Sequence, residues 1–209
     1  MKNIIDVCCG SKMFWFDRDN KNVIFCDKRA ERHTLNDKTA KGGKRDLIIS
    51  PNVISDFTAL PFPSNYFNLV VFDPPHYKGI GDKSWLRAKY GRLDGEWRFM
   101  LRDGFSECFR ILALGGTLIF KWASVEFPLS EILTLTPEIP LFGHNSGKRS
   151  LTHWITFTKT TQAVVKPLAA DLEQTTRKIK NARYCIKCGG WLFREGIDRQ
   201  PTKRTTDEV

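Results

Sequence analysis

The chain has 209 residues and a formal net charge of +10, with 41% hydrophobic and 12% aromatic residues. This length and composition favour one globular α/β domain with a small appendage and exclude an intrinsically disordered protein. A positive surplus of this size indicates a polyanionic partner such as nucleic acid; an ordinary basic, solvated surface is the alternative.

The sequence was searched for membrane-spanning and secretory segments. No apolar run approaches the roughly 18 residues that a membrane span needs, and residues 1–5 lack a secretory pattern. We therefore expect a cytoplasmic protein whose six cysteines are reduced.

The first element is an apolar run over residues 3–9 that ends at Gly10. It predicts a strand and a tight turn, followed by a helical segment around residues 13–16. A glycine in the first strand-to-helix turn lets a ligand approach the backbone, as in nucleotide-binding folds. Because Lys12 follows and no further glycines come after it, the turn is not a dinucleotide fingerprint.

The second strand covers residues 22–27 and ends on Asp27. An acid at this place, about twenty residues after the first turn, is where such folds hold a ribose. Residues 28–46 are polar and basic without a clear period, so no helix is assigned to them, and an irregular or extended excursion is the interpretation.

The third strand is expected from residues 47–50 and 53–56, which end on Asp56. Phe57 follows and is available to pack on a flat ring. Asp6, Asp27 and Asp56 thus form a series of acids at strand ends, which favours a ribose-bearing ligand.

The fourth strand, residues 67–72, is apolar without alternation, which is typical of a strand buried on both faces of a parallel sheet. Asp73, Pro74, Pro75 and His76 follow, and the two prolines end the strand and hold the next segment rigid. Ligands bind beyond the carboxyl ends of such strands, so these residues are candidates for an active edge. A simple turn signal is the alternative.

Taken in order, these motifs resemble class I S-adenosylmethionine-dependent methyltransferases over residues 3–122. The Asp-Pro-Pro motif resembles the amino-group methyltransferases, including DNA adenine methyltransferases, in which an aromatic residue follows the prolines. The Cys-Cys-Gly turn with Phe-Trp-Phe after it resembles phage or prophage methyltransferases. The resemblance implies a Rossmann-like methyltransferase sheet of seven strands, mostly parallel with an antiparallel closing strand, in a domain of residues 1–160.

The resemblance also implies roles for single residues. S-adenosylmethionine is the implied cofactor. Its methionine end would lie against the first turn, with Asp6, Cys8, Cys9 and Gly10. Asp27 would bind the ribose hydroxyls, and Asp56 and Phe57 would contact the adenine. The first motif lacks the second glycine common in the family and no helix precedes the first strand, so we expect another element to enclose the methionine end.

The catalytic residues implied by the resemblance are Asp73, Pro74, Pro75 and His76. The carboxylate of Asp73 and the carbonyl of Pro74 would accept the two hydrogens of an exocyclic amine, held in place by the rigid prolines. His76 would stack on the target base, where the family usually carries Tyr, Phe or Trp.

Two segments have compositions suited to nucleic acid. Residues 76–94 interleave glycines, basic residues and aromatics, and residues 143–150 form a basic loop. Solvated connections are the alternative. The candidate contacts are Lys78, Lys83, Trp85, Arg87, Lys89, Lys148 and Arg149.

The remaining elements follow from periodicity. Residues 96–114 read as an amphipathic helix that Gly115 and Gly116 end, with Phe99, Phe105 and Phe109 on its apolar face and Cys108 in the core. The further expectations are a strand at 117–122, a helix at 125–133 and a closing strand pair at 141–142 and 152–158.

The C-terminal extension, residues 161–209, is basic, with an expected helix at 169–182 and a disordered last stretch. Cys185 and Cys188 resemble half of a zinc ribbon, but zinc needs four ligands and there is no second Cys-x-x-Cys. We expect a reduced hairpin turn and no metal; zinc bound with further ligands is the alternative.

The expected function is S-adenosylmethionine-dependent methylation of an exocyclic amino group in DNA, with N6 of adenine first. Methylation of an RNA base, methylation of a protein side-chain amide and a non-catalytic nucleic-acid-binding module are the alternatives. Asp73 in place of Asn and the net charge of +10 count against the amide. Neither the target sequence nor the oligomeric state follows from the sequence.

Overall fold

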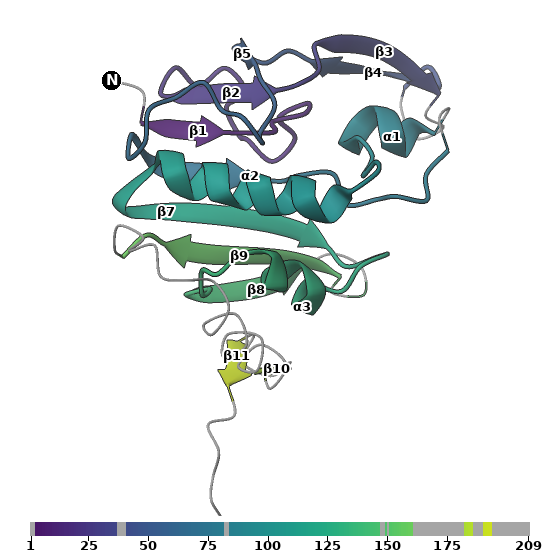
Figure 1. Ribbon diagram of the computed structural model, residues 1–209. Coiled ribbons are helices and arrows are strands. Elements are labelled where there is room, and N and C mark those ends of the chain that lie inside the picture. Colours follow the sequence, from purple (N-terminus) through teal and green to yellow (C-terminus); the bar gives the residue numbers. More distant parts are fainter. Residues whose placement is uncertain are drawn as a thin grey trace, which may run out of the picture.

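The computed structural model describes residues 3–36, 41–81, 84–146, 149, 151–160, 182–185 and 190–193. Seven of its strands form one sheet (Figure 1). They are β1 (Ile4–Asp6), β2 (Val23–Asp27), β5 (Val53–Ile54), β6 (Phe67–Phe72), β7 (Leu112–Ala123), β8 (Phe142–Ser146) and β9 (Thr152–Thr158).

The order of strands in this sheet is β5-β2-β1-β6-β7-β9-β8. The first five are mutually parallel, and β9 runs antiparallel to both β7 and β8. The prediction of a mostly parallel seven-stranded α/β sheet with one antiparallel closing strand is therefore confirmed. The apolar β6 lies at its centre, with Phe67 and Phe72 fully buried.

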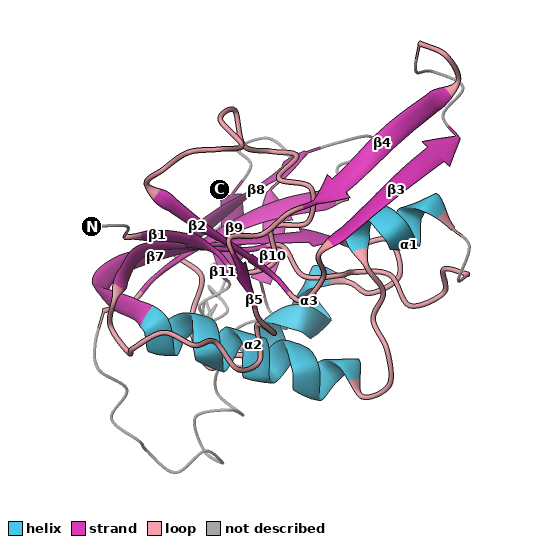
Figure 2. Ribbon diagram, turned by 90° about the horizontal axis from the view of Figure 1, so that it is seen from above, coloured by secondary structure: helices cyan, strands magenta, loops and turns pink. Residues whose placement is uncertain are grey.

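The helices are α1 (Trp85–Tyr90), α2 (Trp97–Ile111) and α3 (Leu129–Ile132), the last continued by the short 3-10 helix η1 (Leu133–Leu135). Figure 2 places α2 and α3 on one side of the sheet, whereas α1 lies at the edge toward which the parallel strands point. Leu101, Phe105 and Cys108 on α2 are buried, which confirms Cys108 as a core residue.

The expected helix around residues 13–16 is wrong, because the connection from β1 to β2 consists of turns. Its aromatic side chains pack outward from the turns instead of along a helix face. The ring of Trp15 meets Phe25 edge-on at 5.2 Å, and Phe14 meets Trp154 edge-on at 5.5 Å. These tertiary contacts hold the connection without helical hydrogen bonds.

The expected third strand is correct only at Val53–Ile54, where β5 pairs with β2. Residues 47–49 belong to a separate antiparallel ribbon of β3 (Glu31–Asn36) and β4 (Lys44–Ile49). The β-branched residues of 47–49 favour a strand in either place, and the pairing partner in β3 decided between them. The absence of a helix at 28–46 holds for the described part of that segment.

Helix α2 ends at Ile111, three residues before the expected end, because β7 already begins at Leu112. Phe99 is 53% exposed, so its assignment to the apolar face was wrong. The strand expected at 117–122 lies inside β7, and β8 with β9 confirms the closing pair. The helix expected at 125–133 is reduced to α3.

The polar segment 76–94 contains α1, and residues 143–146 belong to β8 rather than to a loop. A small ribbon of β10 (Ala182–Cys185) and β11 (Gly190–Phe193) pairs Cys185 with Gly190. Cys188 and the last ten residues lie outside the described residues. So does the expected helix at 169–182, except for Ala182, which begins β10.

Two searches of the described residues are negative. No helix among them is long and apolar enough to cross a membrane. No three of their His, Cys, Asp and Glu side chains are grouped so as to hold a metal ion. Cys8, Cys9, Cys26 and Cys108 are free thiols.

Candidate active site at the carboxyl edge of the sheet

A cavity of about 430 Å³ opens at the carboxyl edge of the parallel strands. Its walls come from the turn after β1, the end of β2, the start of the β3–β4 ribbon, the segment after β6, and α1. Adjacent parallel strands end at the same edge, which is why motifs far apart in sequence meet here. The volume lies within the range of small-molecule sites.

Asp73 lines this cavity from the end of β6. Its Oδ2 accepts a 2.6 Å hydrogen bond from the ammonium group of Lys121, whereas its buried Oδ1 has no hydrogen-bond donor among the described residues. A buried acceptor without a partner costs roughly 1–3 kcal/mol. A ligand donor that reached Oδ1 would remove this cost.

Lys121 reaches Asp73 from the neighbouring strand β7, and both side chains are largely buried. The lysine ammonium also lies 5.7 Å from the ring centroids of Phe14 and Trp154. These contacts hold the cation against one oxygen of Asp73, so the orientation of the carboxylate is restricted.

The two prolines after Asp73 line the cavity, and α1 ends against the second of them. A Cβ on Gly91 would lie 3.0 Å from Cγ of Pro75, and the φ of Gly91 is +75°. Glycine at this position therefore permits α1 to pack close to the Asp-Pro-Pro segment.

His76 also lines the cavity, but it is only 4% exposed. Its ring is surrounded by Tyr77, Tyr90 and Trp122 at centroid distances of 4.6, 5.6 and 5.9 Å. Burial lowers the pKa of His76 below its ordinary value. A neutral, planar ring in an aromatic cluster is the result, with Nδ1 at 3.3 Å from the carbonyl oxygen of Pro74.

The turn after β1 is held by Asp6, which is fully buried and does not line the cavity. Its Oδ2 accepts a 2.8 Å hydrogen bond from the indole of Trp15, and its Oδ1 accepts one from the backbone N–H of Cys8. Burial, as the largest cause, raises the pKa of Asp6 to about 7. The structure therefore places Asp6 behind the turn, which it holds through Cys8 and Trp15.

Cys8, Cys9 and Gly10 present the turn itself to the cavity. Burial raises the pKa of both thiols far above the physiological range, so neither cysteine is an ionised nucleophile. The φ of Gly10 is +49°, a conformation that favours glycine. The turn can thus bring backbone and uncharged side chains close to a ligand.

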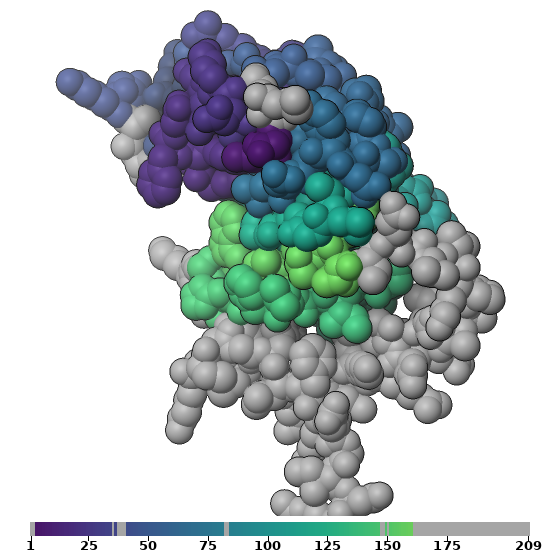
Figure 3. Space-filling view, turned by 90° about the vertical axis from the view of Figure 1, so that its left-hand side faces the viewer, coloured from purple at the N-terminus to yellow at the C-terminus, as the bar shows by residue number. Residues whose placement is uncertain are grey.

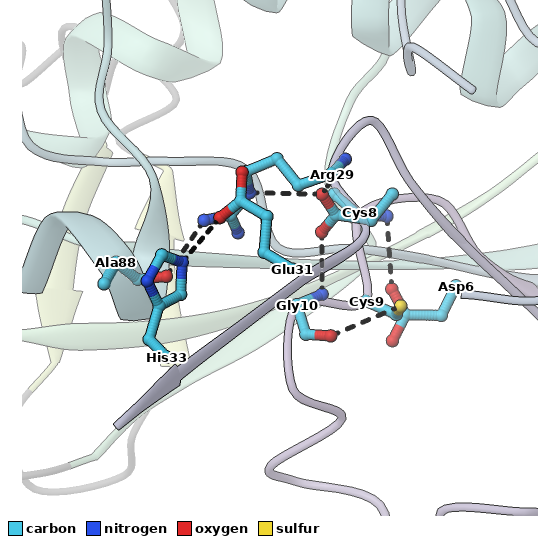
Figure 4. Close-up of polar contacts among 9 residues, drawn as sticks. Asp6, Cys8, Cys9, Gly10, Arg29, Glu31, His33 and Ala88 are labelled. Atoms are coloured by element: carbon cyan, nitrogen blue, oxygen red, sulfur yellow. Dashed lines mark hydrogen bonds and ion pairs between the residues drawn. The ribbon is translucent and has the colours of Figure 1, made fainter. Parts of the chain in front are cut away.

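Asp27 lines the cavity from the end of β2 and is 5% exposed. Its Oδ2 accepts a 2.9 Å hydrogen bond from the N–H of Gly10, and its Oδ1 accepts from the backbone and the Nε of Arg29. The guanidinium of Arg29 then donates to the carbonyl of Ala88 in α1 at 3.0 Å (Figure 4). Arg29 therefore links the acid of β2 to α1 across the cavity.

The expected adenine-binding pair is separated. Phe57 is 5% exposed, lines the cavity and packs edge-on against Phe72 at 5.2 Å. Asp56 is exposed and absent from the lining, because its carboxylate caps its own turn by accepting from the backbone and hydroxyl of Thr58.

Four of the candidate nucleic-acid contacts lie in or beside α1. Arg87 and Lys89 line the cavity, and Trp85 is 51% exposed with the ammonium of Lys89 over its ring. Lys78 is exposed, and its backbone N–H donates to the carboxylate of Glu126.

Lys148 and Arg149 belong to the connection between β8 and β9. Ala123 pairs with Thr152, so this connection is at the carboxyl edge, on the side of the cavity. Arg149 is exposed there. Lys83 and Lys148 lie outside the described residues.

The sequence analysis missed three residues that complete the site: Lys121, Arg29 and Tyr90. Lys121 had a detectable signal, because it is the one charged residue in the apolar run 117–122. Arg29 follows the strand-end acid by two residues. No local signal distinguishes Tyr90 from the other aromatics of segment 76–94.

No protein-family model matches the chain, and no curated protein is similar to it in sequence. Solved structures of similar shape include PH0226 from Pyrococcus horikoshii OT3, with 11% identity, a TM-score of 0.46 and 75% of this chain aligned to 81% of that one. A "putative s-adenosyl-l-methionine-dependent methyltransferase (mmp1179)" from Methanococcus maripaludis has 14% identity, a TM-score of 0.38 and coverage of 78% and 79%. The "putative methylase HI0767" from Haemophilus influenzae has 14% identity, a TM-score of 0.39 and coverage of 77% and 88%. At this level of similarity neither an activity nor a substrate follows from the matches.

Proposed function

We propose that the chain is an S-adenosylmethionine-dependent methyltransferase that modifies an exocyclic amino group of a DNA base, with N6 of adenine as first choice. The observation that carries this proposal is the unpaired, buried Oδ1 of Asp73 beside two prolines in the wall of a cavity. An acceptor held in this way suits an amine whose hydrogens must be received at a fixed position.

The cavity has groups that fit the cofactor. Oδ2 of Asp27 accepts one hydrogen bond within the chain and keeps a second lone pair for a ribose hydroxyl. The turn at Cys8–Gly10 lines the same wall, and Phe57 supplies an aromatic surface. The cofactor supplies an electrophilic methyl group on a sulfonium when it is bound.

The chemistry required of the protein is the orientation of a weak nucleophile, because the lone pair of an exocyclic amine is delocalised into the base. Oδ1 of Asp73 accepts one amine hydrogen. The carbonyl of Pro74 has two lone pairs, of which His76 engages at most one, so it can accept the other hydrogen. Both acceptors are immobile, Asp73 through Lys121 and Pro74 through its ring, so little reorganisation is needed.

A nucleic-acid substrate is supported by charge and by aromatic groups at the cavity. Arg87 and Lys89 in its wall suit phosphate groups, and the exposed ring of Trp85 suits a base. The cluster of His76 and Tyr90 offers flat faces for a base that has left the duplex.

The proposal is tested by incubating the purified chain with methyl-labelled cofactor and separate pools of DNA and RNA, followed by mass spectrometry of the nucleosides. We expect N6-methyladenine from DNA. Label on RNA nucleosides only would replace the DNA assignment, and no transfer to either pool despite cofactor binding would contradict the proposal as a whole.

A further inference from the structure

Two short segments of the chain are strongly basic. Residues 28–46 contain seven Lys and Arg against three Asp and Glu, and residues 77–92 contain five against one. Each segment therefore has a net charge of +4, within a chain whose net charge is +10. The first segment was not among the nucleic-acid candidates.

Both segments flank the mouth of the cavity. Glu31 and His33 at the start of β3 line the cavity, and α1 lines it from the other segment. The β3–β4 ribbon leads from this root away from the body and passes α1, as Figures 1 and 2 agree. In Figure 3 the same ribbon stands out from the molecule at the upper left.

The two faces of the ribbon differ. Leu47 and Ile49 point to the face that is buried at the root. The opposite face is exposed, and polar side chains of the two strands meet on it. Arg32 and Thr34 of β3 both donate hydrogen bonds to the carboxylate of Asp46 in β4.

The outer part of the ribbon is basic and accessible. Lys41 and Lys44 are exposed, and within the described residues neither ammonium has a carboxylate partner. A Cβ placed on Gly42 or Gly43 would meet no atom within 4 Å, so this part of the ribbon stands in open space.

We infer that the β3–β4 ribbon is a DNA-binding arm, which contacts the phosphates of a duplex whose target base enters the cavity. This inference rests on the proposed function and names the surface that would hold its substrate. Lys41 and Lys44 neutralise phosphates, while the exposed face with Arg32 and Asn36 lies along a groove. Helix α1 contacts the strand on the other side of the cavity.

The shape of the ribbon favours DNA over double-stranded RNA. The major groove of B-form DNA admits a two-stranded β-ribbon, whereas the major groove of A-form RNA is too narrow and deep for one. The two-stranded arm beside the cavity therefore matches the major groove of a B-form duplex.

The test is binding of a fluorescent DNA duplex by anisotropy over a series of salt concentrations, without cofactor. We expect the double variant Lys41→Glu/Lys44→Glu to weaken binding by at least about tenfold at about 100 mM salt and to reduce the salt-dependence slope by about two. The matched control is Arg18→Glu/Lys21→Glu, with the same change in net charge on exposed residues ahead of β2 that do not line the cavity. Circular dichroism and the unfolding midpoint of both variants check the fold.

Binding by the ribbon variant equal to that of the wild type, or an equal loss in the control, overturns the DNA-binding arm while leaving the methyltransferase proposal intact. If the wild type transfers no methyl group but the ribbon variant alone loses DNA binding, the result supports the DNA-binding arm and contradicts the proposed activity. If an RNA duplex of the same sequence binds as tightly as the DNA duplex, the inference that the ribbon enters the major groove of B-form DNA is wrong.

Discussion

Two acids follow neighbouring strands of the sheet, and the structure uses them in different ways. Asp6 ends β1 and is fully buried, but both of its oxygens accept hydrogen bonds from the segment that follows it. Asp73 follows β6, and only one of its oxygens is bonded, to Lys121. Both oxygens of Asp6 therefore have a donor inside the fold, whereas Oδ1 of Asp73 has none among the described residues.

The comparison teaches that the position of an acid at a strand end is not enough to assign its role. An acid that lies outside the cavity lining and accepts hydrogen bonds at both oxygens supports the structure, as Asp6 supports the turn with Cys8 and Trp15. An acid in the cavity wall with an oxygen that accepts no hydrogen bond, as Oδ1 of Asp73, remains available to a ligand.

The largest effect is expected from Asp73→Asn. In either orientation of the amide, its NH₂ group faces a donor, which is the ammonium of Lys121 or the amine of the substrate. We expect kcat to fall by roughly 10²- to 10³-fold with cofactor affinity unchanged. Steady-state kinetics and calorimetric cofactor titration measure the two quantities, and a loss of only a few-fold would remove the distinction between Asp73 and Asp6.

A smaller effect is expected from Lys121→Met, which keeps a long side chain but leaves both oxygens of Asp73 without a donor. A freely rotating carboxylate should lower kcat by roughly 10- to 100-fold, since catalysis depends on its orientation. Lys121→Arg keeps a charged donor and should retain more activity than Lys121→Met. Equal kinetics in both variants would indicate that Lys121 acts only in packing.

The smallest effect on activity is expected from Asp6→Asn, which tests the supporting acid. Because the pKa of Asp6 is raised to about 7, the native state keeps this proton at pH values where the unfolded chain has lost it. The unfolding free energy of the wild type should therefore decrease between about pH 4 and 7, by at most about 4 kcal/mol from this group. Asn does not titrate, so urea unfolding of the variant should show a flatter dependence over that range.

An unchanged pH dependence in Asp6→Asn would mean that Asp6 does not control the pH dependence of the unfolding free energy over this range. Loss of methyl transfer in Asp6→Asn as large as in Asp73→Asn would contradict the division of roles between the two acids.

Much of the site could be predicted because its signals are local. Apolar runs that end at Asp27 and Asp73 follow from strand periodicity and from proline, and Phe57 was expected and lines the cavity. Asp56 does not line the cavity, and its carboxylate accepts from the hydroxyl of Thr58, a local hydrogen bond that the strand pattern does not predict.

The sequence by itself determined the parallel sheet, the edge at which its acids gather and the rigid Asp-Pro-Pro segment, because period, proline and glycine act through neighbouring residues. Only the tertiary structure decided which oxygen of Asp73 remained unpaired, since Lys121 lies on another strand. It also decided that residues 44–49 leave the sheet as the arm of a ribbon, and that Arg29 and α1 close one side of the cavity. These hydrogen bonds and strand pairings join residues that are far apart in sequence, so they form only in the folded chain.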